Sequence, residues 1–223
     1  MAYSNGTVLN FHNTLLRESD VNLLMGPHWL NDQIISFYLE YLEKNVYQNT
    51  RGLLFISPEV VQCLKFVSGQ EMSIFLGPLN AKGKSFIFFP LNDNDEAKAG
   101  GNHWSLLVFS RPESTFYYYD SLHFGTSLKK SLRPFLFELA KAIDCPEFEV
   151  RGGECVKQNN SYDCGIHVIY NIECLARRAL KHNSLDDDES TAADENPTKI
   201  TNQKIRQKRQ DLLNLIQKLG GKL

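Results

Sequence analysis

The 223-residue chain is 42% hydrophobic and 11% aromatic, which is enough for one domain with a packed core over residues 1–223. Its net charge of −2 and pI near 6.3 argue against a nucleic-acid-binding surface. Since no apolar run has the length that a membrane helix needs, we also expect no membrane partner.

The cysteines indicate a reducing environment. Their number, five, is odd, and they form neither a CxxC pair nor a zinc-like spacing with histidine. No apolar signal segment precedes them. We therefore expect free thiols in the cytoplasm or nucleus, and no metal site. The five residues are Cys63, Cys145, Cys155, Cys164 and Cys174.

The first third of the chain contains two predicted helices. Residues 1–10 are expected to be a mobile start, followed by a short strand or turn at 15–21. One helix is then expected to begin at Asn31 or Asp32, either of which can cap it. The second begins at Pro58, because proline after serine is typical of a first helical turn.

The entrance of the first helix permits two interpretations. Trp29 and Asp32 are either a hydrophobic staple and a cap, or an edge that binds a ligand. The helix that follows has an apolar stripe, formed by Ile34, Ile35, Tyr38, Leu39 and Leu42.

Strand-like runs occupy the middle of the chain. They cover residues 84–92, 102–110, 114–121 and 147–150, with a polar, glycine-ended loop at 92–101 and a helix at 126–143. The acidic segment 183–197, with six acids and no Lys or Arg, is expected to be a disordered insert before a last helix at about 203–219. Helices at both ends and strands in the middle predict an α+β fold.

The segment 157–165 places Cys164 where a polar loop runs into an apolar helix. A thiol in the first helical turn faces unpaired N–H groups and the positive end of the helix dipole, which favour a thiolate. Gly165 leaves the sulfur uncrowded. The alternative is an inert core cysteine, which is common in proteins.

A base and an orienting acid accompany this thiol in the sequence. A thiolate nucleophile needs a neighbouring base, and the base needs an acceptor that fixes its tautomer. His103 opens one predicted strand and Asp120 ends the next, so pairing of the two strands would bring them together. His167, inside the helix, fits a core role better, and His123 fits a solvated turn.

An oxyanion intermediate needs hydrogen-bond donors aimed at its charge. The backbone N–H of Cys164 is one candidate, and the side-chain amide of Gln158, six residues upstream, is a second. The alternative for Gln158 is a solvated loop residue. Asp163 is expected to fix the loop or cap the helix, since its charge opposes a thiolate.

These motifs resemble the sentrin/SUMO-specific protease family of ubiquitin-like-protein proteases, over about residues 15–182. The resemblance rests on His103-Trp104-Ser105-Leu106, Asp120-Ser121, Gln158, Asp163-Cys164-Gly165 and the upstream segment 29–35. The compact chain, the Asn92-Asp93-Asn94 loop, Gly100-Gly101 and residues 160–164 are most similar to the deneddylase branch.

The resemblance implies a papain-like core, in which a mixed, mainly antiparallel sheet is flanked by helices. It implies Cys164 as nucleophile at a helix N-terminus, His103 as general base and acid, Asp120 as orienter and Gln158 as oxyanion donor. Trp29 and Trp104 would form a tunnel for a C-terminal Gly-Gly. Asp32 would contact the modifier's tail, and the 92–102 loop, with Asn92 and Asp93, would close over it.

The implied protein is a monomeric thiol isopeptidase and processing protease without cofactor, whose partner is the neddylation modifier with its conjugates. A SUMO protease would share every catalytic residue. A related acyltransferase would need a basic pocket for an acyl-coenzyme, and no Lys or Arg cluster lies near the motifs. An inactive modifier-binding module is a third alternative.

Overall fold

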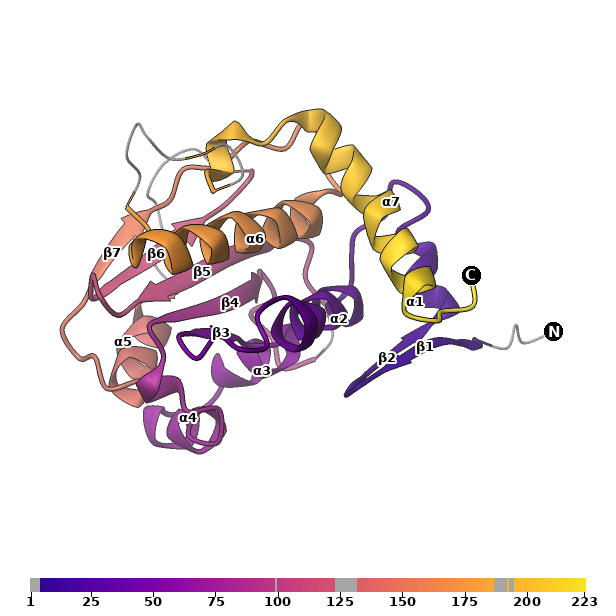
Figure 1. Cartoon of the computed structure of the whole chain (residues 1–223). Coiled ribbons are helices and arrows are strands. Elements are labelled where there is room, and N and C mark those ends of the chain that lie inside the picture. Colours follow the sequence, from indigo (N-terminus) through magenta and orange to yellow (C-terminus); the bar gives the residue numbers. More distant parts are fainter. Residues whose placement is uncertain (1–4, 99, 123–131, 187–191, 193–194) are drawn as a thin grey trace.

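The computed structural model of the chain describes residues 5–98, 100–122, 132–186, 192 and 195–223 (Figure 1). A mixed five-stranded sheet lies at the centre with helices on both faces, and a two-stranded hairpin lies apart from it. The predicted α+β class with a mixed, helix-flanked sheet is confirmed.

The sheet has the strand order β3-β4-β5-β6-β7. Its two inner pairs, β4–β5 and β5–β6, are antiparallel, and its outer pairs, β3–β4 and β6–β7, are parallel. The strands are β3 (Leu53–Phe55), β4 (Phe86–Asn92), β5 (Trp104–Ser110), β6 (Thr115–Tyr119) and β7 (Glu149–Gly152). The last four match the four predicted strands to within a few residues, and β3 was not predicted.

Alternation along the strands divides the core into two layers, because successive side chains point to opposite faces of a sheet. Phe86, Phe88 and Leu106 pack on one face, and Ile87 and Leu107 on the other. Both faces are covered, so every residue of β5 and β6 is buried.

Each layer is closed by its own helices. The apolar cluster on the first face includes residues of α2 (Asp32–Tyr41), α6 (Cys164–His182) and α7 (Asn202–Lys218), of which α7 packs on α6. The second packs on α3 (Pro58–Leu64), α4 (Gly69–Leu76) and α5 (Leu132–Ala142). Figure 1 shows α6 along one face of the sheet and α5 beyond the other. The predicted starts of α2 and α3 and the predicted last helix are confirmed.

The N-terminal segment differs from its prediction. Residues 7–10, expected to be mobile, belong to β1 (Thr7–Phe11), which pairs with β2 (Thr14–Arg17) before the short α1 (Glu18–Asn22). The strand is retained because Val8 and Leu9 are buried in the core, and Lys222 donates its backbone N–H to the carbonyl of Val8 at 3.1 Å.

Short helical segments complete the described chain: η1 (Leu42–Val46), η2 (Ala81–Gly83) and η3 (Pro197–Lys199). The described ends of the acidic segment 183–197 are packed. Leu185 is buried, and the buried carboxylate of Glu195 accepts hydrogen bonds from Lys181 and His182, each at 2.9 Å. Residues 187–191, 193 and 194 lie outside the described part.

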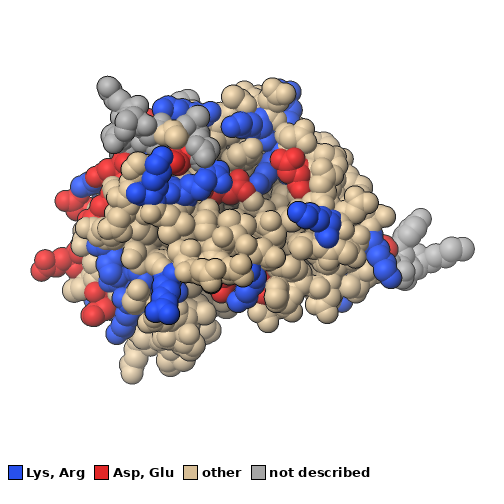
Figure 2. All heavy atoms as spheres, viewed as in Figure 1, with Lys and Arg blue, Asp and Glu red and all other residues tan. Residues whose placement is uncertain are grey.

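On the face drawn in Figure 2, acidic and basic side chains are interspersed, and no extended area carries one sign. Among the described residues, no helix combines the length and the apolar character needed to cross a bilayer.

Candidate active site

The ends of three inner strands lie side by side at one end of the central sheet. Asn92 ends β4, Trp104 begins β5 and Asp120 directly follows β6. Asn92 pairs with Trp104, and Leu106 pairs with Tyr119. In an antiparallel pair, one strand starts where its neighbour ends. His103, just before β5, therefore lies between the end of β4 and the end of β6.

Asp120 holds the imidazole of His103, as the sequence predicted. His103 Nε2 lies 2.8 Å from Asp120 Oδ1, and both side chains are buried. The carboxylate is itself fixed: Oδ1 accepts the backbone N–H of Leu122 at 2.9 Å, and Oδ2 accepts the hydroxyl of Tyr118 at 3.1 Å. A carboxylate held by two donors keeps the ring in one orientation.

Cys164 approaches His103 from the other side. It is the first residue of α6 and is 1% exposed, and its thiol lies close enough to His103 to contribute to the raised pKa of that ring. Since Nε2 of the ring faces Asp120, Nδ1 is the nitrogen available to the sulfur. The N–H groups of the first helical turn and the dipole favour negative charge at this position.

These contacts change the proton affinity of His103. Burial lowers its pKa, but the hydrogen bonds with Asp120 and with Cys164, together with the charges of both groups, outweigh burial and raise the pKa from 6.5 to about 9. The ring is therefore poised to hold a proton between two acidic partners, as an imidazolium paired with a thiolate requires.

Gly165 permits a close approach between α6 and the loop before α2. A Cβ at this position would lie 3.0 Å from Cβ of Leu30. Leu30 in turn accepts a hydrogen bond from Trp104 Nε1 on its carbonyl, at 2.8 Å. The sequence explained Gly165 by access to the sulfur; the structure adds that it lets Leu30 pack against the start of α6.

Gln158 is fixed in the loop that leads to Cys164. Its side-chain oxygen accepts the hydroxyl of Ser121 at 2.6 Å, and its backbone N–H donates to the carbonyl of Ser121 at 2.9 Å. Nε2 donates to the carbonyl of Asn160 at 2.7 Å. An amide has two N–H donors, so one remains for a further acceptor, and Gln158 is a positioned side chain.

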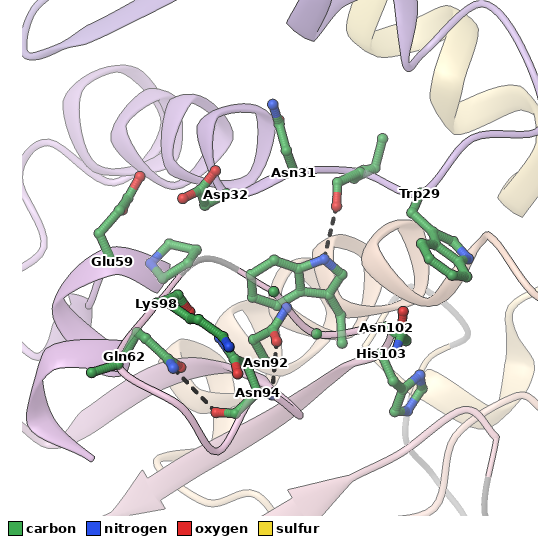
Figure 3. Close-up of a pocket in the computed structure, with 16 residues that line it drawn as sticks. Trp29, Asn31, Asp32, Glu59, Gln62, Asn92, Asn94, Lys98, Asn102 and His103 are labelled. Carbon is green, nitrogen blue, oxygen red and sulfur yellow. Dashed lines mark hydrogen bonds between the residues drawn. The ribbon is translucent and has the colours of Figure 1, made fainter. Parts of the chain in front are cut away.

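A cavity of about 450 Å³ adjoins His103. In Figure 3, Trp29 and His103 lie on one side of it, and Asp32, Glu59 and Gln62 lie on the opposite side. The lining residues come from the loop before α2, from α3 and from the segment between β4 and β5. Five predicted site residues line the cavity: Trp29, Asp32, Asn92, His103 and Trp104.

Asp32 lies beside a second carboxylate in this cavity. Burial and the charge of Glu59 raise the pKa of Asp32 above its ordinary value, against hydrogen bonds from backbone N–H groups that lower it. Glu59 accepts a hydrogen bond from Ser36 at 2.8 Å. Asn31, and not Asp32, caps α2, since its side chain accepts the N–H of Ile34. Asp32 is therefore available for a ligand.

The segment after β4 is tied down by its own side chains. Asp93 Oδ1 accepts the backbone N–H groups of Asn102 and His103, at 2.7 and 3.0 Å. Asp93, predicted to bind substrate, thus supports the backbone at His103 and does not line the cavity. Gly101 has φ of +92°, and a Cβ there would lie 1.7 Å from Oδ1 of Asn92, so a side chain does not fit.

Two further histidines, His167 and His182, have structural surroundings. His167 is buried within α6, and burial lowers its pKa to about 4, so it is neutral near pH 7. His182 pairs with Glu195. His123 lies outside the described residues. Among those described, no group of three or more His, Cys, Asp or Glu side chains is arranged to hold a metal ion.

One contributor was missed from the sequence. Arg209 on α7 forms an ion pair with Asp163, the residue before Cys164, and contacts the loop that carries Trp29. The only local signal was the charge of Asp163, which called for a partner. That partner lies in a distant helix.

A buried thiol at a helix N-terminus, an imidazole and a carboxylate lie near one another, which is an arrangement suited to cysteine-protease chemistry. Residues 28–212 match the Ulp1 protease family, C-terminal catalytic domain. The chain therefore belongs to the Ulp1 protease family and is a cysteine protease.

Several relatives are similar over most of the chain. Sentrin-specific protease 8 of Homo sapiens is 38% identical over 181 residues, covering 78% of this chain and 83% of the relative. Probable sentrin-specific protease 8 of Dictyostelium discoideum is 34% identical and covers 97% and 99%. NEDD8-specific protease 1 of Arabidopsis thaliana is 33% identical and covers 73% and 72%.

The fold is similar to that of a solved relative. The C-terminal Ulp1 protease domain, solved in complex with Smt3, the yeast orthologue of SUMO, superimposes with a TM-score of 0.70 at 25% identity. The match covers 96% of this chain and 88% of that domain.

Proposed function

We propose that this protein is a thiol isopeptidase and processing protease that cleaves after the C-terminal Gly-Gly of a ubiquitin-like modifier. The observation that carries the proposal is the row of Cys164, His103 and Asp120 at the end of a cavity flanked by Trp29 and Trp104. The two indoles account for the Gly-Gly that precedes the cleaved bond of the modifier, since residues without side chains pass most easily between them.

In the acylation step the sulfur of Cys164 attacks the carbonyl carbon of the modifier's terminal glycine. The proton held by His103 passes to the leaving amine, which is a lysine side chain of a conjugate or the N-terminus of a short propeptide. The C–N bond breaks and a thioester remains. Asp120 keeps the imidazole oriented throughout, because its own position is fixed by Leu122 and Tyr118.

In the second step water replaces the amine. His103 takes a proton from the water, whose oxygen attacks the thioester, and the thiolate of Cys164 leaves. The oxyanion of both tetrahedral intermediates is stabilised by the backbone N–H of Cys164 and the remaining N–H of Gln158. Each such donor is worth about 100- to 1000-fold in rate.

The C-terminal tail of the modifier lies in the cavity, and its Gly-Gly passes between the indoles. Asp32 binds a polar or cationic group of the tail, since its side chain lines the cavity and Asn31, not Asp32, is the N-cap of α2. The 92–102 loop, with Asn92 on the cavity wall, closes over the tail when it binds. Asp93 keeps the backbone at His103 in place during this closure.

The modifier we propose is NEDD8, so that the reactions are deneddylation and processing of the NEDD8 precursor. The support is the similarity, over most of both chains, to proteins named sentrin-specific protease 8 and NEDD8-specific protease 1. SUMO is the second candidate, because the fold is similar to that of a Ulp1 domain solved with a SUMO orthologue. We place the activity in the cytoplasm or nucleus, on account of the five free cysteines.

Linear fusions test the proposal. NEDD8, SUMO and ubiquitin, each extended beyond Gly-Gly by the same short peptide, are incubated with the protein, and kcat/KM is measured by mass spectrometry of the products. We expect cleavage after Gly-Gly with NEDD8 preferred. A preference for SUMO keeps the mechanism and contradicts the proposed modifier. Folded protein that cleaves none of them contradicts the protease activity and favours an acyltransferase or a modifier-binding module.

A further inference from the structure

The guanidinium of Arg209, near Cys164, donates hydrogen bonds to four different residues. It donates from Nε and Nη2 to Oδ1 of Asp163 at 3.0 and 2.8 Å, and from Nη2 to the carbonyl of Tyr162 at 3.3 Å. Nη1 donates to the carbonyl of Leu23 at 2.7 Å and Nη2 to that of His28 at 2.8 Å. One side chain thus contacts two loops that are distant in sequence.

Both loops flank the start of α6. The first, residues 23–31, carries Trp29. The second, residues 158–163, carries Gln158 and ends just before Cys164. They also contact each other, because Trp29 Nε1 donates to the carbonyl of Ser161. Arg209 therefore contacts both the loop of the exposed indole and the loop that leads to the thiol, and its Cζ lies over the ring of Tyr162, 5.6 Å from the centroid.

The positive charge of Arg209 compensates the negative charge of Asp163. The Asp163 side chain is 5% exposed and directly precedes Cys164, so its carboxylate alone would oppose a thiolate there. Apart from Arg209, Asp163 is held by Asn160, whose neutral amide donates to Oδ2 at 2.8 Å. The cation makes the carboxylate usable as a loop anchor without an uncompensated negative charge beside the sulfur.

We propose that Arg209 is a positioning residue for the cleavage reaction, with two separable effects. Its charge offsets Asp163 and so preserves the thiolate of Cys164, and its fork of donors holds the loop of Trp29 against the loop of Cys164. The inference rests on the role proposed for Cys164 above. Lysine would supply the charge without the fork, because an ammonium cannot match the planar geometry of five N–H donors.

The position of α7 has support besides Arg209. The adjacent Lys208 is buried and forms an ion pair with Glu173 of α6, and both contact the hydroxyl of Tyr38 on α2. Ile205, Leu212 and Ile216 pack into the core. Substitution of Arg209 is therefore expected to leave the helix docked.

Other titratable groups near this end of α6 would contribute to any pH profile. They are unchanged in the variants below, except for Asp163 in one of them, so differences between variants report on the pair. These groups are His103 and Asp120 from the sheet edge, Lys157 from the loop, and His167 one turn further along α6.

The experiment compares Arg209→Gln, Arg209→Lys and the double variant Asp163→Asn/Arg209→Gln with wild type. Arg206→Gln is the matched control, since Arg206 lies on the same helix, is exposed and lines the same cavity as Arg209, while its side chain donates to the carbonyl of Asn202 within α7. Two quantities are measured: the rate of iodoacetamide alkylation at Cys164 against pH, read from the mass of its peptide, and kcat/KM for the preferred modifier fusion.

We expect Arg209→Gln to slow alkylation of Cys164 near neutral pH about tenfold. Its kcat/KM should fall by about 100-fold, because the loops also lose their spacing. The double variant should regain the alkylation rate but not kcat/KM. Arg209→Lys should alkylate like wild type with kcat/KM reduced about tenfold, and Arg206→Gln should match wild type in both measurements.

Equal behaviour of Arg209→Gln and Arg206→Gln would overturn the proposal. Slow alkylation that Asp163→Asn does not restore would overturn the charge effect, and full kcat/KM in Arg209→Lys would overturn the effect of the fork. If circular dichroism finds Arg209→Gln unfolded, Arg209→Lys and the double variant carry the same two tests. Wild-type protein without any turnover contradicts the proposed function instead, and so the two failures are distinguishable.

Discussion

The two indoles beside the cavity are held in different ways. Trp104 is 7% exposed, begins the central strand β5 and donates from Nε1 to the carbonyl of Leu30 at 2.8 Å. Trp29 is 46% exposed, lies in a loop and donates to the carbonyl of Ser161. One wall is part of the hydrophobic core and the other depends on loop hydrogen bonds. Stability and substrate passage can therefore be separated by mutation.

The same contrast extends to the groups around the walls. His103 and Asp120 lie 17 positions apart and are joined by adjacent strands. Trp29 and Cys164 are joined through Arg209, 46 positions beyond Asp163. The rigid side carries the proposed base, His103, and the proposed orienting acid, Asp120. The side built from loops carries the exposed indole and the segment that leads to Cys164, the proposed nucleophile.

The largest effect should come from substitution of Cys164, the proposed nucleophile next to the two indoles. Cys164→Ala removes the proposed nucleophile, and turnover should fall by about 10⁴-fold or more, because only binding and oxyanion donors remain. Modifier binding should persist, since the cavity is unchanged. Steady-state cleavage and a binding titration measure the two quantities. Cys63→Ser, at an exposed cysteine, is the control, and measurable turnover by Cys164→Ala would refute the assignment.

The rigid side can be tested by pH. The pKa of His103 is raised from 6.5 to about 9, so the protonated ring adds to the free energy of unfolding. This contribution is fully present below about pH 6.5 and is lost as the pH rises through about 9. The general acid is lost over the same range, so kcat/KM should decline above about pH 9. Asp120→Asn removes causes that raise the pKa, and the basic limb should move to lower pH.

In the same variant kcat/KM near neutral pH should fall by about 10²- to 10⁴-fold. The measurement is a profile of kcat/KM from about pH 6 to about pH 10 for wild type and Asp120→Asn. A basic limb at the same pH in both proteins would show that Asp120 does not control the imidazole.

Substitution of each indole sharpens the contrast between the walls. Trp104→Ala should lower the free energy of unfolding by about 3–5 kcal/mol, as expected for a buried tryptophan. Trp29→Ala should change it by less than about 0.5 kcal/mol, while kcat/KM falls by about 10- to 100-fold because the tail is no longer confined. Denaturant unfolding and kinetics measure these effects. Equal losses of stability would contradict the contrast.

The smallest effect is expected at Asp32. Burial and Glu59 raise the pKa of Asp32, so its charged form is disfavoured in the folded state, and this cost is present above its folded pKa and relieved as pH falls. Asp32→Asn should therefore raise Tm slightly near neutral pH. It should also raise KM about tenfold through the lost charged hydrogen bond. Asp211→Asn, at an exposed residue of α7, is the control, and an unchanged KM would remove Asp32 from the binding site.

The sequence predicted the parts of the site that depend on short-range pattern. Strand-like apolar runs, with a polar, glycine-ended loop between the first two, located β4, β5 and β6. Their antiparallel pairing then placed His103 beside Asp120. The step from a polar loop to an apolar helix located Cys164 at the start of α6. Each of these features is encoded within a few residues of the group concerned.

The parts that escaped prediction depend on long-range packing. The hairpin of β1 and β2 has a short, weak pattern and is held by contacts with the chain's far end at Lys222. Asp93 was expected to touch substrate, and only the fold reveals its bonds to the backbone at His103. Arg209 is one of several cations in α7, and nothing near it in sequence distinguishes it.

The most direct test of the proposed activity is covalent capture. NEDD8, SUMO and ubiquitin carrying a C-terminal electrophile are mixed separately with the protein, and adducts are measured by intact mass and located by peptide mapping. A single, rapid adduct with the NEDD8 probe, attached to Cys164, is the predicted result. No adduct from folded protein, or attachment to another cysteine such as the exposed Cys63, would contradict it.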